Sequence, residues 1–127
     1  IDDFTALENV ALPARIKGLT TAAANNQAMA ILAQMGLSAR LSHFPWQLSG
    51  GERQRCAIAR ALINQPEIIF ADEPTGNLDH ESAQQVSDLM MSLCRLNGAT
   101  LILVTHNPHL AGQTDRQLTL VDGALRQ

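Results

Sequence analysis

The chain has 127 residues, of which 46% are hydrophobic and 17% are charged, and its net charge at pH 7 is −3. This length fits one domain or a piece of a larger one, and the hydrophobic content argues against intrinsic disorder. The mild negative charge and the 3% of aromatic residues, with no Tyr, argue against direct nucleic-acid binding.

Hydropathy and cysteine content indicate the kind of environment. No apolar run approaches the roughly 20 residues that cross a bilayer, and the first residues are acidic where a signal peptide is basic. We therefore expect a soluble protein that is not secreted. Cys56 and Cys94 have no metal-ligand spacing, and we expect both to be reduced and buried.

The first half of the chain carries helical signals. Thr5 and Glu8 match the T-x-x-E capping box, which predicts a helix from there to at least Pro13. Apolar residues recur every three or four positions over residues 20–35, just before Gly36, and predict a second helix. Residues 37–47 have no sustained period and predict a connector. A third helix is predicted from about residue 50 to residue 63, where the sequence NQP stops it.

The second half alternates between strand and helix signals. Residues 68–71 (IIFA) and 101–104 (LILV) are continuous apolar runs, as expected of strands buried on both faces. The helical pattern between them, which ends at residues 97–98, completes a βαβ unit with a parallel sheet. Residues 117–126 predict a hairpin with a type I′ turn at Asp122-Gly123.

Residues 48–55 (LSGGERQR) carry the most information. Ser49 and Glu52 match another capping box, which explains this pair but not the two glycines between them. Gly50 and Gly51, however, each weaken a first helical turn by roughly 0.5 to 1 kcal/mol relative to Ala. Two glycines are expected where the backbone must come very close to something. Free N–H groups at a helix N-terminus, beside a serine hydroxyl, predict a site for phosphate oxygens.

Two strand ends carry the second and third candidate sites. Asp72 and Glu73 follow the first apolar strand, where one carboxylate could hold Mg²⁺ and the other could orient or deprotonate a water. The alternative is that both simply solvate the strand end. His106 ends the next strand and is expected on the same rim as Glu73, although a single strand-end histidine is more often structural.

Taken together, these motifs resemble the nucleotide-binding subunit of ATP-binding-cassette (ABC) proteins. Residues 48–55 resemble its signature sequence, with Glu52 where Gln is more usual, and residues 68–73 resemble its Walker B strand and catalytic glutamate. Residues 77–79 (NLD) resemble its D-loop, and His106 its switch histidine. The segments FTALENV, QLSGGERQR and ADEPTGNLD resemble the corresponding sequences of the subgroup that serves lipoprotein release and macrolide-type export.

The resemblance implies an α/β fold: a partial P-loop NTPase (RecA-like) parallel-sheet core over residues 66–127, with an ABC helical subdomain over residues 1–65. It also implies ATP and Mg²⁺ as cofactors. In the family's scheme Asp72 helps to hold Mg²⁺, Glu73 polarises the attacking water and His106 contacts the γ-phosphate. The residues implied to contact nucleotide, several of them on the opposite subunit's ATP, are Ser49, Gly50, Gly51, Glu52 and Asp79.

The family's phosphate loop, G-x-x-x-x-G-K-[ST], does not occur in the sequence. We therefore expect a C-terminal portion of a subunit, inactive by itself. The implied partners are a second ATPase subunit and a transmembrane permease, with the subunit at the cytoplasmic face of the inner membrane. Two alternatives remain: a soluble ABC ATPase of DNA repair or translation, and a non-catalytic truncated product or interaction module.

Overall fold

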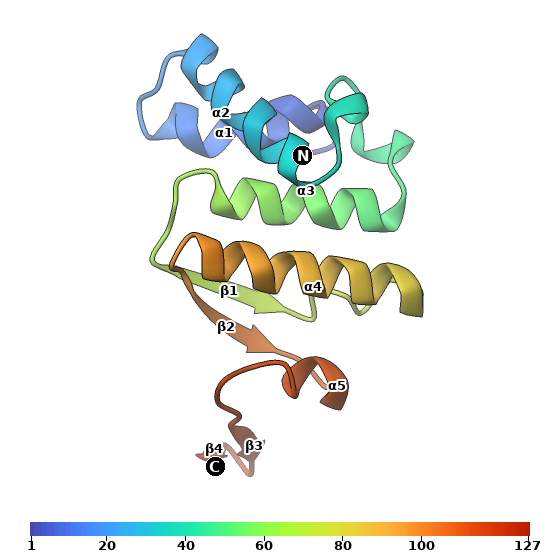
Figure 1. Cartoon of the computed structure of the whole chain (residues 1–127), viewed down its shortest axis with the longest axis vertical. Helices are drawn as coiled ribbons and strands as arrows, with labels where there is room; N and C mark the ends of the chain where they lie inside the picture. Colours follow the sequence, from blue (N-terminus) through green and yellow to red (C-terminus); the bar gives the residue numbers. More distant parts are fainter.

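A computed structural model describes all residues, 1–127, as a stack of helices above a small sheet (Figure 1). The helices are α1 (Ala6–Ile16), α2 (Thr21–Gln34), α3 (Gly50–Leu62), α4 (His80–Leu96) and α5 (Pro108–Ala111), with short 3₁₀ turns η1 (Ser38–Arg40) and η2 (Pro45–Gln47) before α3. The strands are β1 (Ile68–Asp72), β2 (Thr100–Val104), β3 (Thr119–Val121) and β4 (Ala124–Arg126). The three predicted helices of the first half are confirmed, and the predicted connector contains both 3₁₀ turns.

Side-chain caps begin the four long helices. Thr5 and Ser49 each accept a hydrogen bond from the backbone of the third helical residue, and a glutamate returns the bond, so both predicted capping boxes are present. Thr20 caps α2 and Asp79 caps α4 without such a return. These local bonds satisfy helix N–H groups that have no partner within the helix.

The helical half packs through small residues. Helix α1 lies against α2 and α3, and α3 lies against α4. Alanines at these contacts let the helix axes approach closely, and larger side chains fill the centre. Buried residues of this part include Ala14, Ala24, Ala28, Val10 and Leu32. One cluster of 20 buried residues continues from here into α4 and β1, so the predicted division at residue 65 stays a prediction.

The predicted βαβ unit is confirmed. Strands β1 and β2 pair in parallel, with Ile68 opposite Thr100 and Asp72 opposite Val104, and α4 connects them. Side chains of β1 and β2 that point towards the helices, such as Ile69, pack on the core around α4. The carboxyl ends of both strands therefore lie at one edge, on the same side of the molecule as the first turns of α3 and α4 (Figure 1).

The prediction that the strands are buried on both faces is wrong. Alternate residues of β1 and β2 face away from the helices, and Phe70 is 76% exposed while Val104 is 59% exposed. Helices cover this sheet on one side only, because the chain forms a single helical layer against it. A continuous apolar run thus produced a strand with one buried and one solvent-exposed apolar face.

The remaining predictions on local structure hold. The C-terminal hairpin pairs β3 with β4, and Asp122 and Gly123 both have the positive φ of a type I′ turn. Cys56 and Cys94 are free and buried, and burial raises the pKa of both thiols. None of the helices combines the length and the hydropathy that spanning a bilayer requires. Helix α5 was not predicted; Asn107 caps it.

Candidate functional site

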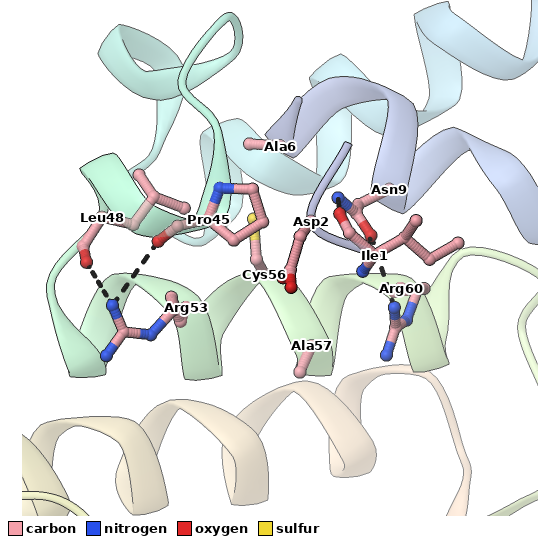
Figure 2. A pocket seen from close by; sticks show the side chains of 10 residues that line it. All are labelled: Ile1, Asp2, Ala6, Asn9, Pro45, Leu48, Arg53, Cys56, Ala57 and Arg60. Atoms are coloured by element: carbon pink, nitrogen blue, oxygen red, sulfur yellow. Dashed lines mark hydrogen bonds between the residues drawn. The ribbon is translucent and has the colours of Figure 1, made fainter. Parts of the chain in front are cut away.

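The sequence-predicted residues lie on an open edge rather than in a pocket. A pocket of about 160 Å³ lies on the face of α3 that is turned away from α4, between this helix, the chain's first residues and η2 (Figure 2). It includes Arg53, Cys56 and Arg60 but none of the predicted site residues. Of the predicted site residues, only Asp72 borders a second pocket. The side chains that line this pocket are mainly apolar and come from α3, α4 and β1.

Glu73 and His106 meet at this edge, as predicted. The Glu73 Oε1 atom lies 2.6 Å from the His106 Nδ1 atom and accepts a hydrogen bond of 2.6 Å from the His106 backbone N–H. The hydroxyl of Thr105 donates to the other oxygen, Oε2, at 3.2 Å. Thr105 was missed by sequence reasoning, although its position directly before His106 at the strand end could have indicated it.

The hydrogen bonds set the charge state of Glu73. Burial alone would raise the pKa of this carboxyl, but the bonds from His106 and Thr105 and the nearby His106 ring lower it, and the net direction is downward. The side chain is 35% exposed. A carboxylate offers about four acceptor positions. Three are in use, so one remains on Oε2 for a water or another donor.

The backbone turns sharply at Glu73. Its φ of 42° lies in the left-handed region, which a non-glycine residue adopts at a cost of about 1 to 3 kcal/mol. The Glu73 N–H still donates to Val104 O, so the strand pairing holds it in place. The turn directs Glu73 across the sheet edge to the end of β2, and the adjacent Asp72 stays exposed.

Asp72 fits Mg²⁺ only as one ligand among several. Its carboxylate has no hydrogen bond or ion pair within the chain, and no group of three or more His, Cys, Asp or Glu side chains is arranged to hold a metal ion. Mg²⁺ in nucleotide sites usually takes one or two carboxylates, waters and phosphate oxygens. A single free carboxylate at a strand end is compatible with that donor set.

The first turn of α3 keeps donors free for an anion. The backbone N–H groups of Gly50 and Gly51 donate no hydrogen bond within the chain. The Ser49 hydroxyl oxygen accepts from the Glu52 N–H at 3.2 Å, which leaves its own O–H to donate. The N-terminal end of a 13-residue helix adds a partial positive charge.

Glu52 has a structural role in this turn. Its Oε2 accepts the Ser49 N–H at 2.8 Å, and its Oε1 accepts from the Arg40 side chain at 2.9 Å. The Ser49 backbone bond, followed by the Arg40 bond, lowers the pKa of the Glu52 carboxyl despite burial. Contact between Glu52 and a nucleotide stays a prediction.

Gly50 has a packing reason that the sequence did not reveal. A Cβ atom at Gly50 would lie 3.1 Å from the Leu78 Cδ2 atom, and one at Gly51 would lie 3.7 Å from the Cβ of Ser82. The close approach expected at these glycines is therefore made, for Gly50, by the chain's own Leu78. Asp79, next in sequence, accepts from the Ser82 N–H at 3.0 Å. The side chain of Ser82, followed by this backbone bond, lowers the pKa of the Asp79 carboxyl.

Comparisons with known proteins agree with these motifs. The family model described as ABC transporter matches residues 1–76. The chain is 52% identical, over its whole length, to the uncharacterized ABC transporter ATP-binding protein YbbA of Escherichia coli K12, and it covers 56% of that protein. It is 52% identical over 126 residues to the lipoprotein-releasing system ATP-binding protein LolD of Shewanella oneidensis, covering 99% of this chain and 55% of LolD.

A solved structure is similar in fold. The dimeric structure of a post-hydrolysis state of the ATP-binding cassette MJ0796, bound to ADP and Pi, has a TM-score of 0.84 and 38% sequence identity. The match covers 100% of this chain and 56% of that chain. The chain thus spans a little over half the length of the relatives that it matches.

Proposed function

The chain belongs to the ABC transporter family, and from that premise we propose that its residues form part of an ATP-hydrolysing subunit that powers export or lipoprotein release. The phosphate-binding loop of that subunit is supplied from outside these 127 residues. The observation that carries the proposal is the Glu73–His106 pair, 2.6 Å apart at the carboxyl end of two parallel strands.

In this proposal the two strand ends perform the chemistry. Glu73, ionised at neutral pH, uses its remaining acceptor position to orient and polarise the water that attacks the γ-phosphate. His106 holds the Glu73 carboxylate through its backbone N–H and its ring, and it keeps its second ring nitrogen for the phosphate. If Nδ1 donates to Glu73, then donation from Nε2 to phosphate requires the doubly protonated imidazolium. Asp72 would contribute one oxygen to Mg²⁺, which would neutralise phosphate charge.

The first turn of α3 serves a second nucleotide. The Ser49 hydroxyl and the N–H groups of Gly50 and Gly51 would donate to phosphate oxygens of an ATP that a partner subunit holds. The free donors in this turn support this role, and the dimeric MJ0796 cassette supports a two-subunit arrangement. A membrane permease as the further partner and the cytoplasmic face of the inner membrane as the location are what the family resemblance implies, and the LolD relative, the ATP-binding protein of a lipoprotein-releasing system, supports a role in such a system.

The test is ATP turnover of the subunit that contains these residues. Glu73→Gln keeps the size of the side chain but removes its charge, so turnover should fall by roughly 10² to 10⁴ while ATP stays bound and the dimer accumulates. Asp72→Asn should instead shift the Mg²⁺ dependence. Glu67→Gln makes the same change at the other end of β1 and should leave turnover unaltered. Near-normal turnover of Glu73→Gln would rule out its role in the chemistry.

A further inference from the structure

An exposed aromatic pair lies just before α3, and the site described above does not use it. The rings of Phe44 and Trp46 stack with their centroids 4.6 Å apart and their planes within 4° of parallel. Trp46 is 64% exposed although one of its faces lies on Phe44, so its other face is open to solvent. It is also the one tryptophan of a chain with no tyrosine.

Arg53 links this pair to the first turn of α3. The Arg53 Nη1 atom donates to Leu48 O at 2.6 Å and to Pro45 O at 3.5 Å, which holds η2 against the helix (Figure 2). Its Nη2 atom lies 4.0 Å from the position of a Cβ at Gly50. The Arg53 guanidinium therefore lies between η2, which carries Trp46, and the first turn of α3, which carries the free N–H groups.

The order of these groups matches the parts of a nucleoside triphosphate. Trp46 and Gly50 are four residues apart, so their Cα atoms are at most about 14 Å apart. Phosphates at the free N–H groups could thus place the base of the same molecule near the indole. Indole faces stack on any base, and a neighbouring guanidinium favours negatively charged phosphates.

We propose that Trp46 stacks on the base of the ATP whose phosphates contact Ser49, Gly50 and Gly51. This inference rests on the proposed role of the α3 N-terminus and adds the base-binding group on that side of the nucleotide. Phe44 supports the indole from behind and fixes its plane. Stacking does not distinguish between bases, so this contact should tolerate GTP as well as ATP.

The experiment uses the intrinsic fluorescence of Trp46 in the chain itself. ATP, GTP and inorganic tripolyphosphate are each titrated to millimolar concentrations, while the amide resonances of Gly50 and Gly51 are followed by NMR. We expect all three to shift the amides, and ATP and GTP alone to quench Trp46 in a saturable way. Trp46→Ala should weaken ATP binding by roughly 5- to 100-fold, leave tripolyphosphate binding unchanged and be largely rescued by Trp46→Phe. Phe70→Ala, which removes another exposed aromatic ring, is the control and should change neither the binding of ATP nor the binding of tripolyphosphate.

The outcomes separate the two proposals. If the nucleotides and tripolyphosphate shift the amides equally but Trp46 is not quenched, the stacking inference is wrong and the phosphate site stands. If Trp46→Phe binds ATP as weakly as Trp46→Ala, the ring does not act by stacking and the inference is again wrong. If nothing shifts the Gly50 and Gly51 amides, the phosphate role of α3 is wrong, and the inference fails with it.

Discussion

In residues 1–65 the apolar side chains face one another between three helices, whereas in residues 66–127 one whole face of the sheet points to solvent. Most of the 25 buried residues belong to the first region. Most of the exposed large apolar side chains belong to the second; they include Ile68, Phe70, Leu96, Ile102, Val104, Leu118, Leu120 and Leu125. The helical region buries most of its large apolar side chains within the chain, whereas the α/β region leaves many of its own exposed.

The total surface area agrees with this contrast. The chain exposes 7900 Å², whereas a compact monomer of 13.7 kDa is expected to expose about 6,600 Å². The excess of about 1,300 Å² exceeds the share that each partner buries in an ordinary protein interface. The candidate catalytic edge thus belongs to the region whose packing is least complete.

The largest expected effect separates the two regions by stability. Leu32→Ala removes a fully buried side chain from the helical core and should lower the free energy of unfolding by about 2 to 5 kcal/mol. Phe70→Ala removes a larger side chain that is 76% exposed and should change it by less than about 0.5 kcal/mol. Urea denaturation measures both. A large loss in Phe70→Ala would mean that the open face is covered in solution.

How much the sequence predicted also differs between the regions. The capping pairs and the 3.6-residue periods located all three helices of the first half, because those signals are local. The βαβ unit and the meeting of Glu73 with His106 were predicted because parallel strands end at one edge. The open face was not, since an apolar run does not reveal how many layers cover it. The left-handed φ of Glu73 and the Gly50–Leu78 contact depend on tertiary packing, and no sequence pattern marked them.

A comparison of two helix caps tests whether Ser49 does more than cap. Ser49 caps α3 and Thr20 caps α2, and each accepts a backbone N–H at 3.2 to 3.3 Å. Ser49→Ala and Thr20→Ala should each lower the free energy of unfolding by about 0.5 to 2 kcal/mol. Only Ser49→Ala should also weaken tripolyphosphate binding, as followed by the Gly51 amide resonance. Equal binding by both variants would leave Ser49 with a capping role alone.

Gly50 offers a smaller effect with a diagnostic sign. Alanine is favoured over glycine in a helix by about 0.5 to 1 kcal/mol, but a Cβ here would press on Leu78 at 3.1 Å. Gly50→Ala should therefore destabilise the wild-type chain slightly and stabilise a chain that already carries Leu78→Ala. A double-mutant cycle measured by thermal denaturation gives the coupling, expected near 1 kcal/mol. If Gly50→Ala changed the stability of both chains in the same direction, Leu78 would not occupy the space beside Gly50.

The smallest effect concerns the charge of Glu52. Its pKa is lowered in the folded chain below the ordinary value of 4.5, so the stabilisation that it provides is complete above that pH and is lost as the pH falls through the folded-state pKa. Glu52→Gln should therefore lower the free energy of unfolding by no more than about 1 kcal/mol at pH 7, and this difference from wild type should shrink under acidic conditions.

Glu8→Gln is the matched control, because Glu8 completes the other capping box with Thr5 and makes no ion pair within 4 Å. Both variants lose a charged acceptor at a capped N-terminus, but only Glu52→Gln also loses a partner of Arg40. Thermal melts of the two variants at pH 7 and pH 3.5, in low and high salt, separate these contributions. If 1 M salt leaves the gap between the two variants unchanged, the Arg40 ion pair does not stabilise the first turn of α3, since exposed ion pairs are screened at that ionic strength. If salt closes the gap, the ion pair helps to fix the turn whose free N–H groups are proposed to meet phosphate.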